Sequence, residues 1–175
     1  MRLERVFKNS DRFFNEAFAL YESAFPLLER RDEKEQERVL SKDDYHFDLI
    51  ISEDSFIGIM LYWEVGDIIF LEHFATNESV RGKGYGAKAL EKLKEKGKII
   101  LLEIEPPVDE MTSRRYCFYK RNGFIMNDVY HIQAKYHKGD KDLELKILSY
   151  PRTLTKEEYR NFYEYMIREV SVAEN

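Results

Sequence analysis

Seven consecutive residues near the middle of the sequence could hold a phosphate group. They lie between a strand-like and a helical segment, and they are Arg81, Gly82, Lys83, Gly84, Tyr85, Gly86 and Ala87. Glycine adopts positive φ and lets the backbone approach a ligand with no Cβ in the way. A helix start adds backbone N–H groups without intrahelical partners and the positive end of the helix dipole. Together these features suit phosphate oxygens, although such a turn can also serve only to start a helix.

Two nucleotide-binding motifs differ in how well they fit this cluster. From Gly82 to Ala87 the sequence satisfies the dinucleotide pattern G-x-G-x-x-A, and Glu103 or Glu105 follows at roughly the spacing of a ribose ligand. That pattern usually follows its strand directly, whereas residues 76–81 intervene here. Segments of hairpin composition also lie on both sides. A nicotinamide-dependent oxidoreductase stays an alternative, whereas the P-loop pattern cannot be written through these positions.

The elements that must position this cluster follow from the spacing of apolar residues. Strands are predicted at 3–7, 45–52, 56–65, 67–75, 99–104, 124–136 and 143–150. Helices are predicted at 14–25, from the glycine cluster to about 97, at 111–122, and from a capping box at Thr155 and Glu158 to about 170. The charged stretch 28–44 is predicted to be a short solvated helix or a mobile loop with few core residues.

This order of elements predicts a single mixed α/β (α+β) domain over residues 1–175. Short connections between successive strands require antiparallel pairing, and only the central β-α-β can form a right-handed parallel crossover. The expected fold is therefore a mostly antiparallel sheet of about seven strands with that one parallel crossover. Helices are expected on both faces, with an additional helix at the C-terminus.

Composition excludes several classes of protein. The chain has 175 residues, a net charge of −5, 43% hydrophobic residues and one cysteine, so a disordered chain and a disulfide scaffold are excluded. No apolar run reaches the roughly 18 residues that span a bilayer, and the first residues lack the apolar core of a secretory signal. We expect a soluble, cytoplasmic protein without a membrane partner. Mild acidity argues against nucleic-acid binding, and His46, His131 and His137 lack metal-ligand spacing.

Two motifs together resemble the GNAT superfamily of N-acetyltransferases. Arg81, Gly84 and Gly86 match the pattern Q/R-x-x-G-x-G/A, by which that family binds pyrophosphate. One strand later, the stretch 114–124 resembles its second signature, a helix that ends in F-Y-x-x-x-G-F. The resemblance implies acetyl-CoA as acyl donor, with its pyrophosphate on backbone N–H groups of the glycine cluster. It also implies a pantetheine arm between strands 67–75 and 99–104.

Acetyl transfer to an amine requires a base, a donor to the carbonyl oxygen and an acid for the departing thiolate. The resemblance assigns the acid to Tyr119, one helical turn before Gly123, although a tyrosine there can also be a packing residue. The backbone N–H of Phe74 is the expected contact to the carbonyl oxygen. Thr112 stands where the family often has an asparagine, so one pantetheine contact of the family is missing here.

Glu72 is the expected base, with His73 in reserve. Alternation along a strand sends the two side chains to opposite faces and places Glu72 on one face with Phe70 and Phe74. Among aromatic rings a carboxylate loses solvation, and we expect this to raise the pKa of Glu72 toward a useful value. A solvated or ion-paired glutamate is the structural alternative.

The predicted function is acetyl transfer from acetyl-CoA to a primary amine by direct attack, without a metal. A GNAT-fold module that binds CoA without catalysis is the main alternative. The acceptor is expected to be a small-molecule or peptide amine, and the excess of acidic residues would suit a cationic one. Because the C-terminal helix could pack on a second subunit, a homodimer stays open.

Overall fold

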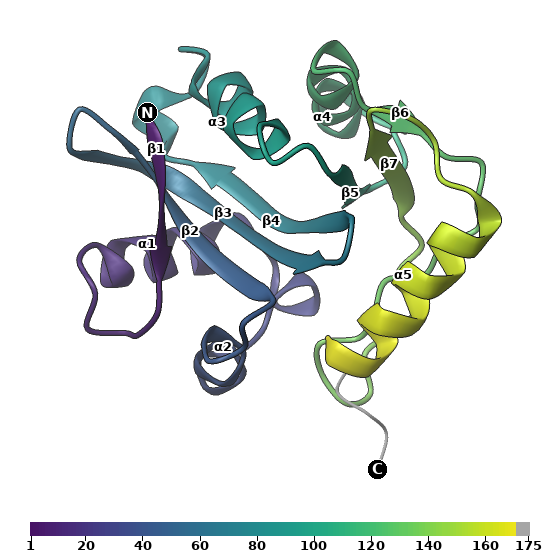
Figure 1. Cartoon of the computed structure of the whole chain (residues 1–175), viewed down its shortest axis with the longest axis horizontal. Coiled ribbons are helices and arrows are strands. Elements are labelled where there is room, and N and C mark those ends of the chain that lie inside the picture. The colour runs from purple at the N-terminus through teal and green to yellow at the C-terminus, as the bar shows by residue number, and fades with distance from the viewer. Residues whose placement is uncertain (171–175) are drawn as a thin grey trace. The chain divides into compact units, whose positions relative to one another are not determined.

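The computed structural model describes residues 1–170 as parts of two compact units (Figure 1). The first unit comprises Met1–Leu27 and Arg31–Ile100, and the second comprises Leu28–Arg30 and the chain from Leu101 onward. The prediction of one domain over residues 1–175 stays a prediction, and its last residues, 171–175, lie outside the described part of the chain.

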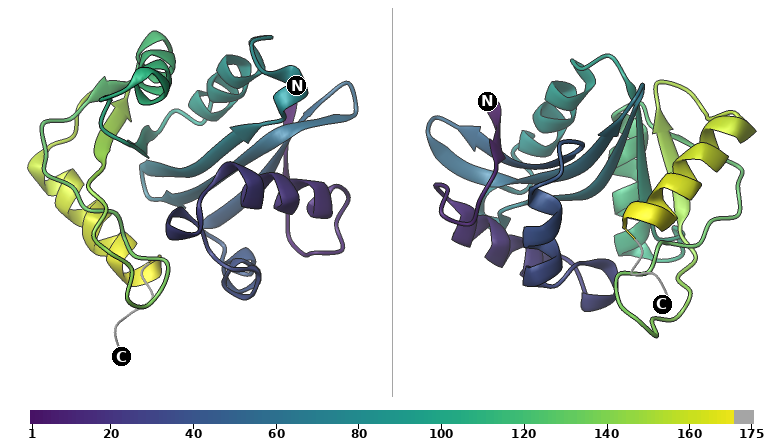
Figure 2. Two further views of the ribbon diagram at one scale, coloured as in Figure 1. Left: turned by 180° about the vertical axis from the view of Figure 1, so that it is seen from behind. Right: turned by 60° about the horizontal axis from the view of Figure 1, so that its bottom comes forward.

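Antiparallel strands and three α-helices make up most of the first unit. The strands are β1 (Arg2–Val6), β2 (Tyr45–Ser52), β3 (Ser55–Val65) and β4 (Ile68–Thr76), and each pairs with the next. The helices are α1 (Phe14–Ala24), α2 (Glu33–Leu40) and α3 (Tyr85–Lys94), with short 3₁₀ turns η1 (Leu27–Glu29) and η2 (Glu78–Val80). Helices α1 and α3 cover opposite faces of these strands (Figure 2), as predicted.

The strand order β1-β2-β3-β4-β5-β7-β6 contains the predicted parallel crossover. Strand β5 (Ile99–Ile104) follows α3 and runs parallel to β4. At its start the backbone N–H of Ile99 donates to the carbonyl oxygen of Asp67, at 3.0 Å. The mixed, mostly antiparallel sheet is thus confirmed, with seven strands in the described residues.

The long strand predicted at 124–136 is wrong. Strand β6 covers only Ile125–Met126 and pairs with β7 (Lys146–Tyr150). Regular pairing stops after Met126, although the backbone N–H of Asn127 still donates to the carbonyl oxygen of Ile147 at 2.9 Å and an isolated antiparallel bridge joins Ile132 to Glu144. The side-chain amide of Asn127 donates to Ser149 Oγ at 2.8 Å, and its carbonyl oxygen accepts from the backbone N–H of Leu154 at 2.8 Å.

Both helices of the second unit begin with capping boxes. Asp109 and Thr112 cap α4 (Glu110–Arg121), and Thr155 and Glu158 cap α5 (Lys156–Glu169) as predicted. A buried imidazole links α5 to β5: His131 lies 2.5 Å from the Glu103 carboxylate and 3.0 Å from the Tyr159 hydroxyl. The additional C-terminal helix is therefore fastened by polar contacts as well as by its apolar face.

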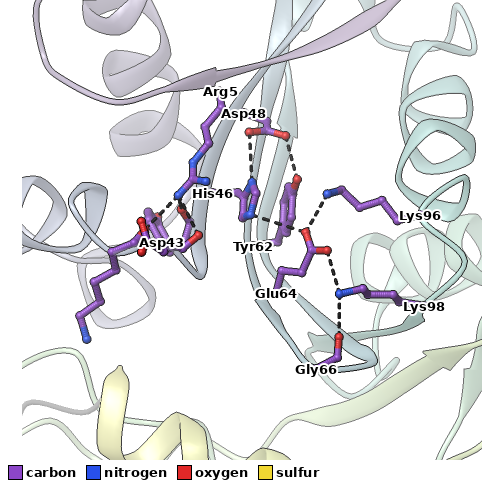
Figure 3. Close-up of polar contacts among 11 residues, drawn as sticks. Arg5, Asp43, His46, Asp48, Tyr62, Glu64, Gly66, Lys96 and Lys98 are labelled. Carbon is purple, nitrogen blue, oxygen red and sulfur yellow. Dashed lines mark hydrogen bonds and ion pairs between the residues drawn. The ribbon is translucent and has the colours of Figure 1, made fainter.

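An ionisable cluster lies on β2 and β3 in the first unit (Figure 3). Asp48 is buried and accepts a hydrogen bond from the Tyr62 hydroxyl at 2.9 Å. The imidazole of His46 stacks on the Tyr62 ring, with 4.5 Å between ring centroids, and lies 3.5 Å from Glu64. Glu64 is in turn paired with Lys96 at 2.7 Å.

Two groups of this cluster titrate away from their ordinary values in opposite directions. Burial raises the pKa of Asp48 to about 6, despite the hydrogen bond from Tyr62. Burial also lowers the pKa of His46 to about 4, and the positive charges of Arg5 and Lys96 add to this effect. Ionised Asp48 therefore costs stability above its folded pKa, and protonated His46 costs stability below its own.

We expect replacement of Asp48 by asparagine to stabilise the fold only at the higher pH. The free energy of unfolding should rise by about 1–2 kcal/mol near pH 7.5, because the charged carboxylate is removed, and by much less near pH 4, where Asp48 is already protonated in the folded state. Urea unfolding at both pH values measures this.

His46→Gln should give the reverse pattern, since it removes a charge that only acid creates. Asp128→Asn, on an exposed position, is the control and should change stability little at either pH. An Asp48→Asn effect of equal size at the two pH values would contradict the prediction.

Candidate functional site

The glycine cluster forms an exposed turn that leads into α3. After η2, Gly82 and Gly84 adopt φ of +78° and +80°, and Gly84 is the N-cap of the helix. A side chain is strained at such φ values, which explains glycine at both positions. A Cβ built at either glycine would meet no heavy atom of the described residues within 4 Å. The space next to the backbone of the turn is therefore open.

The start of α3 is suited to an anion. No side chain caps it, because the N-cap residue is Gly84. The N–H groups of the first turn, beginning at Tyr85, have no partner within the helix and carry the positive end of its dipole. Arg81 is exposed and forms an ion pair with Glu78 at 3.0 Å. Open space, positive φ and uncapped N–H groups together fit a pyrophosphate group.

A β-bulge interrupts β4 just before this turn. Tyr62 pairs with Leu71 and Leu61 pairs with His73, so the register passes over Glu72. The extra residue breaks the alternation of faces. The prediction that Glu72 and His73 point to opposite faces is therefore wrong: the Glu72 carboxylate lies 3.6 Å from His73 Nδ1.

The bulge also separates the three residues predicted to share a face. Cross-strand partners lie on the same face of a sheet. Phe70 pairs with Trp63, whereas Phe74 pairs with Met60 beyond the bulge, on the face opposite to Phe70. Glu72 lies on the face of Trp63, whose indole N–H donates to its carboxylate at 3.2 Å.

Glu72 is the acid of a buried, bidentate ion pair with Arg31. The two guanidinium nitrogens of Arg31 donate to the two carboxylate oxygens at 2.8 and 2.7 Å, and the side chains are 3% and 1% exposed. The backbone N–H of Arg31 donates to the Tyr21 hydroxyl on α1 at 2.8 Å. Its guanidinium lies 5.5 Å from the ring centroids of Tyr45 and of Trp63.

This ion pair reverses the expected titration of Glu72. Burial raises the pKa of the carboxyl group, but the charge of Arg31 and the neighbouring His73 imidazole lower it more, and it lies well below its ordinary value. The expected rise is therefore wrong. A carboxylate held in this way is a weak base at neutral pH. The role of Glu72 as general base stays a prediction, and the ion pair weighs against it.

Sequence reasoning missed Arg31 because it lies in the charged stretch 28–44. The short helix predicted in that stretch is α2, but the stretch is not solvated throughout: Val39 and Leu40 of α2 are buried, as is Arg31 itself. The local signal that was present is Asp32, which caps α2 and fixes where the helix begins. Nothing in the pattern of alternating charges distinguishes Arg31 from its exposed neighbours.

The acid predicted for the reaction, Tyr119, lies in the second unit on α4. It is 8% exposed and contacts the rings of Phe118 and Phe124, with centroids 5.2 and 5.6 Å away. Burial raises its pKa to about 12, although the charge of Arg115 opposes the shift. The hydroxyl is therefore protonated at neutral pH, as a proton donor must be.

Thr112 has a structural partner of its own. Its hydroxyl lies 2.8 Å from the Asp109 carboxylate, and it also accepts the backbone N–H of Asp109 at 3.1 Å. The residue that replaces the family's asparagine is thus part of the helix cap.

The described residues offer neither a cluster of metal-ligating side chains nor a helix suited to span a membrane. Within residues 1–170, no three or more histidine, cysteine, aspartate or glutamate side chains are grouped so as to hold a metal ion. None of the helices in that range combines the length and apolar composition needed to cross a bilayer.

Comparison with known proteins places this geometry in a family. Residues 11–124 match the model of the acetyltransferase (GNAT) family. A presumed acetyltransferase of Bacillus subtilis (strain 168), YjbC, is 30% identical over 159 residues, which cover 81% of this chain and 78% of that protein.

Among solved structures, a presumed GNAT acetyltransferase from Bacteroides thetaiotaomicron has a TM-score of 0.88 at 28% identity, covering 95% and 96% of the two chains. A GNAT acetyltransferase from Elizabethkingia anophelis with acetyl-CoA bound has a TM-score of 0.57 at 11% identity, covering 85% of this chain and 95% of that one. The chain belongs to the GNAT acetyltransferase family.

Proposed function

We propose that this protein transfers an acetyl group from acetyl-CoA to a primary amine. The observation that carries the proposal is the uncapped start of α3, where two glycines at positive φ leave an open, exposed turn. Within Arg81 to Ala87, the backbone N–H groups of Arg81 and Lys83 already donate to the carbonyl oxygens of Glu78 and Val80, at 3.1 and 3.3 Å. Pyrophosphate oxygens would therefore bind the other N–H groups of this range, with the Lys83 side chain adding positive charge. The acetyl-CoA bound by the structural relative from Elizabethkingia anophelis supports the choice of donor.

The reaction proceeds by direct attack of the neutral amine on the thioester carbonyl. A carbon–nitrogen bond forms, the carbon–sulfur bond breaks, the sulfur leaves as a thiolate, and the nitrogen gives up one proton to solvent water. Tyr119, whose raised pKa keeps its hydroxyl protonated at neutral pH, gives its phenolic proton to that thiolate and regains a proton from solvent. The backbone N–H of Phe74 donates to the carbonyl oxygen, where negative charge develops. No metal takes part.

The acceptor is a small-molecule or peptide amine, taken from solution without a nucleic acid or membrane as partner. The net charge of −5 favours a cationic acceptor. The proposed location is the cytoplasm, where acetyl-CoA is available. A homodimer in which α5 packs against a second subunit stays open.

A second candidate function is CoA binding without catalysis. The observation that favours it is the ion pair of Glu72 with Arg31, which occupies the carboxylate expected to act as base. A wild-type protein that binds acetyl-CoA but acetylates none of a polyamine, an aminoglycoside and a lysine peptide would establish this second function.

Replacement of Tyr119 by phenylalanine tests the acid. We expect kcat to fall by about 10²–10⁴-fold, since only the proton donor is removed. The Kd for acetyl-CoA, measured by calorimetry, should stay within about twofold, because substrate binding does not use that proton. Release of CoA thiol, followed with a thiol-reactive chromophore, measures the rate.

Tyr116→Phe, on the same helix, is the matched control and should leave both quantities unchanged. If Tyr119→Phe weakened acetyl-CoA binding as much as it lowered kcat, the hydroxyl would be a binding or packing group, and the assignment would fail.

Ligand-dependent thermal stability tests the glycine turn. Acetyl-CoA at about 100 times its Kd should stabilise the native state by about 2.7 kcal/mol, which raises Tm by roughly 5–11 °C for a chain of this length. NAD at the same concentration should have no effect. Gly84→Val should abolish the shift, because a branched side chain then occupies the space where the phosphate must approach.

Gly97→Val is the control for strain, since Gly97 also has positive φ (+70°) and open space around its Cβ position. It should lower Tm without removing the acetyl-CoA shift. A Gly84→Val protein that still responds fully to acetyl-CoA would refute the proposed donor site, and a shift with NAD alone would support the oxidoreductase instead.

A further inference from the structure

The ion pair between Arg31 and Glu72 joins segments that are 41 residues apart in the sequence. Both side chains are almost fully buried, so both charges have lost their hydration. A buried pair of this kind is often no more stabilising than apolar residues of the same volume, whereas loss of one partner is costly. Stability alone therefore does not account for it, and its place in the fold indicates what else it does.

That place is the bulge of β4. Three donors fix the orientation of the Glu72 carboxylate: the two guanidinium nitrogens of Arg31 and the indole of Trp63. Arg31 is itself fixed by its backbone bond to the Tyr21 hydroxyl. Glu72, the unpaired residue of the bulge, is thus connected to β3 through Trp63 and to α1 through Arg31. These contacts hold the bulge at one position along the strand.

The position of the bulge decides which face of the sheet each residue at the end of β4 occupies. A shift of one residue in a strand exchanges its two faces. His73 to Thr76 follow the bulge and lead through η2 to the glycine turn. Phe74, the expected contact of the thioester carbonyl, is two residues beyond Glu72. Moving or removing the bulge would therefore displace the backbone at Phe74.

We propose that Arg31 is a positioning residue for acetyl transfer: through Glu72 it holds the β4 bulge, and with it the backbone at Phe74, in the place that the reaction needs. The inference rests on the proposed function. It gives Glu72 a role in orientation in place of proton transfer, and it makes the segment that precedes α2 part of the catalytic apparatus.

The effect should fall on kcat rather than on CoA affinity. The glycine turn is held by its own backbone bonds, from Val80 to Asn77 at 3.2 Å and from Arg81 to Glu78 at 3.1 Å, which do not involve the ion pair. Pyrophosphate binding should thus survive a change at Arg31. A displacement of about 1 Å at the reacting atoms can cost about 10²-fold in rate.

The test compares Arg31→Met and Arg31→Lys with Arg38→Met, in which an exposed ion pair of α2 with Glu35 is removed. Initial rates of CoA release are measured with spermidine, kanamycin and a lysine-containing peptide, and the Kd for CoA by calorimetry. We expect Arg31→Met to lower kcat by about 10–100-fold with the Kd within about twofold. Arg31→Lys should recover part of kcat, and Arg38→Met should match the wild type.

Arg31→Met leaves a buried carboxylate without its cation and could unfold the protein. The double variant Arg31→Gln with Glu72→Gln removes both charges and keeps the capacity for hydrogen bonds, so it separates folding from positioning. With a thermal transition close to that of the wild type, it should still show the lowered kcat and unchanged CoA Kd. Wild-type kcat in this variant, or in a folded Arg31→Met, would overturn the inference.

Two further outcomes separate the inference from its assumptions. If Glu72 were the base, Arg31→Met would raise its pKa and move the acid limb of the pH–rate profile to higher pH, which would overturn the positioning role. A lowered plateau with the limb unmoved supports it. A wild-type protein that binds no CoA, or acetylates none of the three amines, overturns the proposed function and the inference together.

Discussion

A carboxylate that is buried away from water is stable in its charged form only beside a cation. In the first unit, the ion pair between Glu72 and Arg31 provides that cation. Because the pair is bidentate and almost fully buried, it allows little variation in the two segments that it joins. Strand β4 therefore carries its bulge at one position, and the segment before α2 is fastened to it. The turn that follows β4 begins from a strand end whose direction depends on this contact.

This arrangement changes how the chemistry of the site is understood. A glutamate beside aromatic rings suggests a raised pKa, but Trp63, whose indole N–H donates to Glu72, also lies 5.5 Å from the Arg31 guanidinium. The charge of Arg31 outweighs the loss of solvation, and the carboxylate is stable in its ionised form. In contrast, the charge of Arg115 does not offset the burial of Tyr119, and its proton is held more firmly than in a free phenol. The acid of the proposed reaction thus fits its role better than the base.

Much of the fold could be predicted because its signals are local. Strand β2 and strand β5 have the predicted bounds, 45–52 and 99–104, since their apolar runs are bounded by turn residues. The capping box at Thr155 and the glycine turn before α3 also depend only on neighbouring residues. The strand predicted at 124–136 is interrupted after Met126, where the side chain of Asn127 bonds to Ser149 and Leu154, residues that no local pattern connects to it.

By itself the sequence determined the residue types at the glycine turn, the order of the strands and helices, and the family, because these depend on spacing along the chain. Tertiary structure alone decided the state of Glu72. The bulge that turns Glu72 toward His73 arises from how β3 and β4 pair, and the cation that neutralises it comes from a segment 41 residues away. Alternation predicts which face a strand residue takes only while the ladder is regular, and burial predicts a pKa only when the charged partners are known.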